Sequence, residues 1–299
     1  MRVLLWTDME GMSRVTDHRE CWPAFAEYWD IGRQKFTDEV KAAAAGLLDG
    51  GASAVYVVNA HGLGWPNILW SELPDGATQA AESEWSRGFD AAFMVGFHAR
   101  VGTSDGFISH TMVPGLTVNV DGRPVTEPHI WAWLEEIPML GVVGDRALAG
   151  QLDGFLAQTP FLAVKDSSSR TETVPAHASV AESHAAIRDF ASNCAKRPLI
   201  PLELPDEFVF EARLDPALAP LADGQAGLAL AADGVLTKEG SVWSRDAYPA
   251  LQAAMSASLQ PFFAAQGDID VSTPEAFRHQ DPVRLESFQA FFTDWVEGP

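Results

Sequence analysis

Three short apolar runs near the start of the chain constrain the fold more than any other feature. They occupy residues 3–7, 54–59 and 91–97, and each is too short for a helix, which favours buried strands. A stretch typical of a helix, residues 31–49, separates the first two and is closed by Gly50 and Gly51. Strand–helix–strand order at this spacing predicts a parallel sheet with right-handed crossovers. We therefore expect an α/β fold with a mostly parallel sheet and helices on both faces.

Later patterns predict a hairpin, a short helix and a further strand. Asp121 and Gly122 stand between two alternating runs, which is a strong hairpin signal. The return strand of this hairpin ends at Glu127, which opens a short Trp-rich helix. Residues 139–143 form another apolar run, and Asp145 is placed to cap the helix that follows.

A proline-rich segment at residues 196–205 is the best candidate for a domain boundary. We expect a metal-binding catalytic α/β domain at 1–200 and a smaller α+β region at 201–299 that serves assembly or substrate binding. In the second region, one strand and two helices are expected at 207–214, 246–265 and 284–296.

The composition disfavours several classes of binding partner. The chain has 299 residues, of which 47% are hydrophobic, so it can bury a substantial core. The net charge of −21 disfavours binding to nucleic acid or to an anionic membrane. The chain contains only two cysteines and no apolar run of transmembrane length. We therefore expect a cytoplasmic protein without a disulfide framework.

Five potential metal ligands lie at or near the ends of the expected strands. They are Asp8, Glu10, His61, His98 and Glu127. In parallel sheets, ligands gather at the carboxyl ends of the strands, so these side chains are expected to meet there. Carboxylate and imidazole groups suit a divalent ion such as zinc, whereas without a cation the carboxylates would repel each other. The pattern predicts a metal site.

Other candidate groups are less clear from local sequence. His110 follows an apolar segment and could be a further ligand, a catalytic acid or base, or a core histidine. The tryptophans at 65, 70, 131 and 133 are expected in the core or in an interface. No Gly-x-Gly-x-x-Gly follows a strand, and there is no P-loop and no Gly-x-Ser-x-Gly, so dinucleotide, nucleoside triphosphate and serine-hydrolase functions lose their main support.

Five motifs, in order, resemble the zinc D-aminopeptidases of dipeptide-transport operons. The motifs are Thr7-Asp-Met-Glu-Gly11, Asn59-Ala-His61, Gly96-Phe-His-Ala-Arg100, Ser109-His-Thr-Met112 and Arg123-Pro-Val-Thr-Glu127. The resemblance extends to about residue 260, and residues from about 267 onward form an extension.

The resemblance implies two zinc ions per chain, with manganese or cobalt as further candidates because oxygen and imidazole ligands accept them. Asp8 would bridge both ions, Glu10 and His61 would bind one, and His98 and Glu127 would bind the other. His110 matches the catalytic histidine of the family. The resemblance also implies a ring-like homodecamer with active sites that face an internal channel.

The sequence thus predicts a metal-dependent aminopeptidase for short peptides with a free N-terminus, with D-alanine-type peptides as the expected substrates. One alternative keeps the metal site but makes the protein an amidase or an L-specific peptidase. Another is a metal-binding protein without catalysis.

Overall fold

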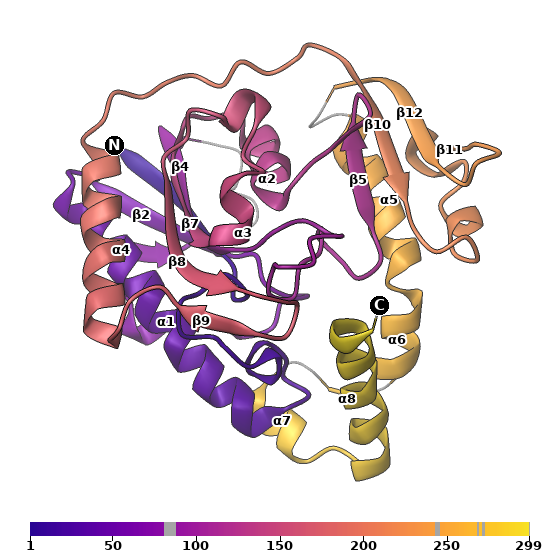
Figure 1. Ribbon diagram of the computed structural model, residues 1–299, viewed down its shortest axis with the longest axis horizontal. Coiled ribbons are helices and arrows are strands. Elements are labelled where there is room, and N and C mark those ends of the chain that lie inside the picture. The colour runs from indigo at the N-terminus through magenta and orange to yellow at the C-terminus, as the bar shows by residue number, and fades with distance from the viewer. Residues whose placement is uncertain (81–87, 243–245, 268, 271–272, 299) are drawn as a thin grey trace.

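A mostly parallel sheet organises the first two thirds of the chain. The computed structural model describes residues 1–80, 88–242, 246–267, 269–270 and 273–298. Within these ranges the sheet has seven strands in the order β3-β2-β1-β4-β7-β8-β9 (Figure 1). The strands are β1 (Arg2–Thr7), β2 (Ala54–Asn59), β3 (Ala77–Gln79), β4 (Ala91–Phe97), β7 (Met139–Asp145), β8 (Phe161–Ser167) and β9 (Thr173–Pro175). Only β9 pairs antiparallel, at one edge.

Helices cover both faces of this sheet because the side chains of its strands alternate between two cores. Leu5 packs in the core that includes Phe36 of α1 (Ala26–Asp49) and residues of α4 (Val180–Ala195). Its neighbours in β1, Leu4 and Trp6, pack in the opposite core. Residues of α2 (Glu127–Glu135) and α3 (Arg146–Ala149) complete that second core. This alternation is the period-two pattern of a strand buried on both faces.

A second, antiparallel sheet lies beside the first (Figure 1). Its order within the described residues is β11-β12-β10-β5-β6. The strands are β5 (Thr117–Val120), β6 (Arg123–Pro124), β10 (Phe208–Arg213), β11 (Ala229–Leu230) and β12 (Leu236–Ser241). Asp121 and Gly122 join β5 to β6 with φ of +50° and +73°, as a tight hairpin turn requires.

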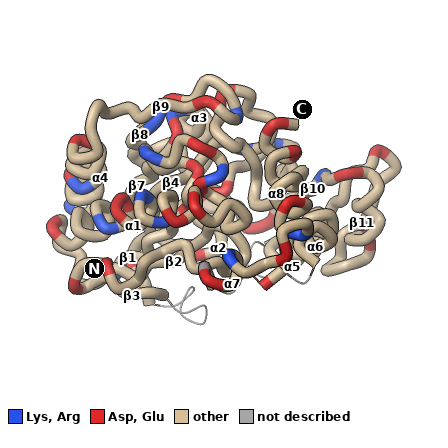
Figure 2. Tube along the Cα trace, turned by 90° about the horizontal axis from the view of Figure 1, so that it is seen from below, with Lys and Arg blue, Asp and Glu red and all other residues tan. Residues whose placement is uncertain are grey.

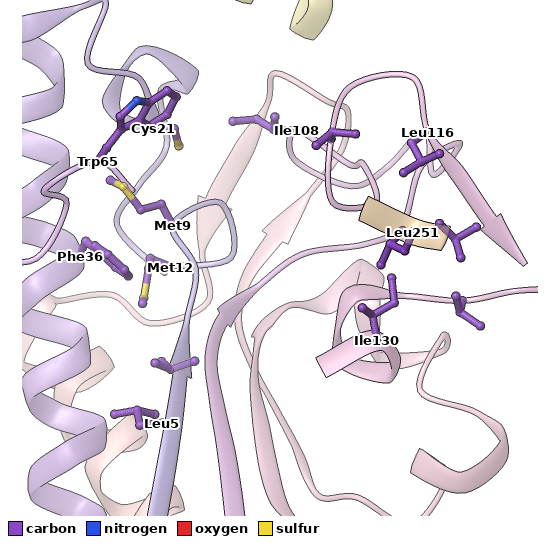
Figure 3. Close-up of a cluster of buried hydrophobic side chains, with 14 of the residues drawn as sticks. Leu5, Met9, Met12, Cys21, Phe36, Trp65, Ile108, Leu116, Ile130 and Leu251 are labelled. Carbon is purple, nitrogen blue, oxygen red and sulfur yellow. The ribbon is translucent and has the colours of Figure 1, made fainter. Parts of the chain in front are cut away.

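Four helices follow the second sheet. They are α5 (Tyr248–Ser258), α6 (Gln260–Gln266), α7 (Pro274–Arg278) and α8 (Pro282–Glu297). Figure 1 shows α8 beside α6, and α7 near the end of α1. One hydrophobic core connects these helices to the first sheet. Figure 3 shows part of it, from Leu5 and Phe36 beside α1 to Leu116, Ile130 and Leu251 on the far side.

The expected α/β architecture is confirmed, including the parallel sheet and the additional antiparallel region. Helix boundaries differ at two places. Helix α1 begins at Ala26, earlier than expected, and its first turn contains Trp29, which is fully buried, packs against Phe277 and hydrogen-bonds Asn67. The expected helix 246–265 is broken at Leu259, since Pro261 has no N–H to continue the helical bonding.

The division into 1–200 and 201–299 stays a prediction. The second sheet itself draws β5 and β6 from the first range and β10–β12 from the second. Acidic residues are spread along the chain trace, as Figure 2 shows. In the part of the chain that the structure describes, every helix is too short or too polar to cross a bilayer.

Candidate metal centre

The predicted ligands meet at one end of the parallel sheet. Strand β1 lies between β2 and β4, and its last residue, Thr7, pairs with Asn59 and Val95. Asp8, His61 and His98 follow these three strand ends directly or within two residues. Glu127 comes from a different direction, as the first residue of α2. The sheet topology therefore brings together groups that are far apart in the sequence.

The first part of the cluster is built around His61. Its Nδ1 lies 3.2 Å from Asp8 Oδ1 and 3.0 Å from Glu10 Oε2. Its Nε2 lies 2.8 Å from the carbonyl oxygen of Cys21. Strand β1 ends at Thr7 and the chain bends there, so Asp8 and Glu10 lie in a loop and not on one face of the strand. Both carboxylates nevertheless contact the same imidazole.

The second part of the cluster contains two stacked imidazoles. The rings of His98 and His110 are 4.1 Å apart with an interplanar angle of 14°. His98 Nε2 lies 3.2 Å from Asp8 Oδ2, and both Nε2 atoms lie 3.7 Å from Glu127 Oε1. The Nδ1 atoms of His98 and His110 face the carbonyl oxygens of Ala99 and Ile108 at 2.9 and 2.8 Å.

These backbone contacts fix which imidazole nitrogen faces the carboxylates. A carbonyl oxygen only accepts hydrogen bonds, so the ring nitrogen beside it carries the N–H. The other nitrogen of each neutral imidazole then points a lone pair toward carboxylate oxygens, which also only accept. Two acceptors facing each other need a proton or a metal cation between them. Glu10 Oε1 is buried without a hydrogen-bond partner among the described residues, which adds a further unmet acceptor.

Electrostatics of the carboxylates leads to the same requirement. Burial favours the neutral form of Asp8, but the adjacent imidazoles of His61 and His98, in their protonated form, outweigh it and hold the pKa of Asp8 well below its usual value. Burial and the charge of Asp8 raise the pKa of Glu10. Burial also raises the pKa of Glu127 to about 7. The three acids cannot all ionise unless positive charge lies among them.

The pKa values of the imidazoles shift in opposite directions. Burial lowers the pKa of His61 and His98, yet the adjacent carboxylates raise it further, well above the usual value for His61 and to about 10 for His98. Burial and the charge of His98 instead hold the pKa of His110 well below its usual value. The cluster thus demands cations, either as protons on imidazoles or as divalent metal ions. Its oxygen and nitrogen donors fit zinc, with no thiolate needed.

Among the described residues, two sets of donor atoms are close enough for metal binding. Each set places its atoms within 4.8 Å of one another. One set is Asp8, Glu10 and His98, and the other is His98, His110 and Glu127. His110 therefore lies within reach of a metal as well as of the cavity, and its role as ligand or as proton-transfer group stays a prediction.

Buried polar residues hold the loop that carries Asp8 and Glu10. Lys165 in β8 is fully buried, and its Nζ donates to the carbonyl oxygens of Glu10 and Val15 at 2.7 and 2.5 Å. The Glu39 carboxylate accepts from the backbone N–H and the hydroxyl of Ser13. Burial lowers the pKa of Lys165 to about 8. These contacts fix the loop to a strand and a helix that carry none of the predicted ligands.

The backbone on both sides of His110 is left-handed. Ile108 and Met112 have φ of +46° and +65°, which is uncommon for residues other than Gly, Asn and Asp, and especially for a β-branched one. The N–H of Met112 donates to Glu127 Oε1, and that of His110 donates to the carbonyl oxygen of Ala99. The surrounding contacts thus hold His110 on a strained loop, as is common at functional sites.

A cavity of about 140 Å³ opens onto the cluster. Asp8, Glu10, His61, His110 and Glu127 all line it. Six of its aromatic lining residues are called the aromatic wall below: Trp22, Trp65, Phe262, Phe291, Phe292 and Trp295. Polar groups converging on one side of a largely apolar cavity are typical of a small-molecule site.

Comparison with known proteins identifies the family. Residues 1–225 match the family model described as D-aminopeptidase. The chain belongs to this family. The resemblance seen in the sequence is therefore confirmed, and so is the prediction of an aminopeptidase, a hydrolase of peptide bonds. No match was found among curated proteins.

One solved structure supports the fold of this D-aminopeptidase family member. It is the Zn-dependent D-aminopeptidase DppA from Bacillus subtilis, described as a self-compartmentalizing protease. The TM-score is 0.78 and the sequence identity is 22%, over 87% of this chain and 98% of that one. At this identity the likeness establishes the shared fold.

In this D-aminopeptidase family member, all six predicted residues lie together, but sequence reasoning missed part of their surroundings. No pattern in the sequence around Lys165 indicates that it holds the Glu10 loop. The sequence predicts helices at 246–265 and 284–296, but it does not indicate that Phe292 and Trp295 line the cavity. Trp65 and Trp131 are buried as expected, and both also line the cavity.

Proposed function

We propose that this chain is a metal-dependent aminopeptidase that hydrolyses short peptides with a free N-terminus, with D-alanine-type peptides as substrates. One observation carries the proposal: imidazole lone pairs and carboxylates face each other beside a cavity, where a cation must balance them. Family membership supports the reaction class. Family membership also argues against a metal-binding protein without catalysis.

We propose two zinc ions per chain, held by the chain's own carboxylates and imidazoles. Asp8 would bind both ions, since its two oxygens face different imidazoles, Oδ1 toward His61 and Oδ2 toward His98. Glu10 and His61 would complete one ion's ligands, and His98 and Glu127 the other's. When bound, zinc supplies a water of lowered pKa and polarises the scissile carbonyl. Manganese and cobalt accept the same donors.

His110 is the proposed proton-transfer group of the site. His110 donates its Nδ1–H to the carbonyl of Ile108, which leaves Nε2 free to accept a proton or to pass one to the leaving amine. The strained loop and the stacked ring of His98 fix the orientation of His110. Asp8, His61 and His110 are buried, which limits their access to bulk water and strengthens the electrostatic contacts that they make.

Chelation and metal restoration test the proposal. Purified protein is analysed for metal content, stripped of metal, reloaded with zinc, and assayed for release of p-nitroaniline from D-alanine and L-alanine p-nitroanilides. We expect about two metal ions per chain and activity only in the loaded protein. Activity that survives complete metal removal would contradict the mechanism, whereas faster hydrolysis of the L-substrate would contradict only the D-specificity.

We also propose that the chain assembles into a ring-like homo-oligomer, with a decamer as the expected form. Support comes from the similar fold of a protein described as self-compartmentalizing. Light scattering of the purified protein measures the subunit number, and a monomer at micromolar concentration would contradict this assembly.

A further inference from the structure

The cavity at the metal centre has two chemically different halves. Its polar groups come from Asp8, Glu10, His61, His110 and Glu127, and the aromatic wall supplies much of its apolar lining. Among the described residues that line this cavity, the only charged or titratable side chains belong to the cluster itself, and none is Lys or Arg. A charged group bound against the aromatic wall would therefore lose its water without gaining a partner of its own.

Half of the aromatic wall comes from the C-terminal helix α8. Phe292 stacks on Trp22 with ring centroids 4.7 Å apart, and Trp295 lies 5.2 Å from the same indole. Two hydrogen bonds also connect this helix and the residue after it to the rest of the fold. Gln289 donates to the carbonyl of Ala24, and Arg170 donates to that of Gly298. This half of the wall lies outside residues 1–225, which match the family model.

Trp295 lies at the boundary between two cavities. Its ring meets that of His110 edge-on at 5.1 Å. A second cavity of about 520 Å³, near Ser104 and Arg170, is also lined by His110 and Trp295. These two residues are the only ones, among the described lining residues, that the cavities share. The rings of Trp295 and His110 thus lie between the smaller cavity and a larger space.

From these observations, and resting on the proposed function, we infer a substrate class. We propose that the aromatic wall binds the side chain of the substrate's N-terminal residue and selects uncharged apolar side chains, with Trp295 setting the upper size. The smaller cavity is close to the about 150 Å³ that admits a benzene ring in a protein interior. Removing the indole would join it to the larger cavity and relax the size limit.

Amino acid amides test this inference, because the N-terminal residue is then the only one with a side chain. The panel contains D-alanine, D-leucine, D-phenylalanine, D-naphthylalanine, D-lysine and D-glutamic acid α-amides, and ammonia release gives kcat/KM. For the zinc-loaded wild type we expect the leucine amide to exceed the lysine and glutamic acid amides at least about 10-fold. For Trp295→Ala we expect the ratio of naphthylalanine to leucine amide to rise about 10-fold. Trp295→Phe should give a smaller rise.

A matched control separates selectivity from general destabilisation. Phe277 in α7 is a fully buried aromatic residue of the same C-terminal region that packs on Trp29 and does not line the cavity. Phe277→Ala should lower the melting temperature and leave the naphthylalanine-to-leucine ratio unchanged. If Trp295→Ala does not fold, Trp295→Phe still reports the size limit.

Binding gives a readout that does not depend on turnover. Quenching of tryptophan fluorescence is titrated with D-leucine amide and D-lysine amide, and we expect tighter binding of the former. Similar kcat/KM for charged and apolar amides, or an unchanged ratio in both Trp295 variants, would overturn the inference and leave the proposed function standing. Hydrolysis of none of the amides would overturn the proposed function, and equal binding of the two ligands would then overturn the inference as well.

Discussion

The polar half of the cavity and its aromatic half are assembled by different means. Adjacent strand ends of one parallel sheet deliver Asp8, His61 and His98, so the sheet topology alone brings these groups together. The aromatic wall combines Trp22 with residues of α8 that lie about 270 positions later, which only long-range packing can join. The chemistry of the site thus depends on backbone geometry, whereas its selectivity depends on the packing of a distant helix.

If backbone geometry determines the polar half, then a single Cβ there should have a very large effect. Gly96 has φ of +85°, and a Cβ on it would lie 1.8 Å from the carbonyl oxygen of Asp8. For Gly96→Ala we expect more than about 4 kcal/mol of destabilisation, together with loss of metal binding, because backbone cannot move away as a flexible side chain does. Urea unfolding and elemental analysis measure the two effects.

A glycine in the C-terminal region gives the matched control. Gly224 has φ of +75°, and a Cβ there would meet nothing within 4 Å. Gly224→Ala should therefore cost only the backbone strain of about 1–2 kcal/mol and leave metal content intact. Equal losses for the two variants would show that left-handed strain, and not the close approach to Asp8, explains the effect at Gly96.

His110 tests the border between the two halves, because it contacts both Glu127 and Trp295. For His110→Ala we expect turnover at least ~10²-fold slower with unchanged metal content, as for loss of a general acid or base. Steady-state kinetics and elemental analysis of the same sample measure this. A loss of one metal ion per chain would instead make His110 a ligand, which the distances also allow.

Much of the fold and of the polar half could be predicted from the sequence for a physical reason. Strands buried on both faces appear as short apolar runs, and β2 and β4 occupy the predicted residues 54–59 and 91–97 without change. Since parallel strands end at one edge, the positions of His61 and His98 after those runs implied their proximity. The family resemblance added His110, which local sequence left undecided.

The aromatic half could not be predicted in the same way. The apolar face of residues 284–296 indicates a buried helix, but its periodicity does not say which surface the helix covers. Trp295 could have packed anywhere that apolar surface was free, and its contact with His110 follows from tertiary structure alone. The role of Lys165 could not be predicted for a related reason. A lysine in a strand is usually solvated, and nothing in the local sequence indicates that its ammonium group donates to two buried carbonyl oxygens.

The smallest expected effect concerns helix α2, which carries two buried glutamates. One belongs to the polar half of the cavity and the other lies away from it. Glu127 opens the helix and contacts imidazoles, whereas Oε1 of Glu135, in the last turn, is buried without a partner among the described residues. Burial raises the pKa of Glu135 to about 8. The difference between the two positions predicts that Glu135 behaves as an uncompensated acid whether or not metal is bound.

Stability of Glu135→Gln as a function of pH measures this. Because the folded-state pKa of about 8 exceeds the ordinary value of 4.5, the folded protein keeps a proton that the unfolded chain releases between these pH values. Wild-type stability therefore falls relative to the variant as pH rises through this window, and the difference is largest above pH 8. We expect Glu135→Gln to gain at least about 1 kcal/mol over wild type by then, since one pKa unit corresponds to about 1.4 kcal/mol.

The gain in stability should be the same with and without zinc, because Glu135 is not among the predicted ligands. A difference between the two proteins that stays constant with pH would show that Glu135 is compensated, and the contrast between the two ends of α2 would then be lost.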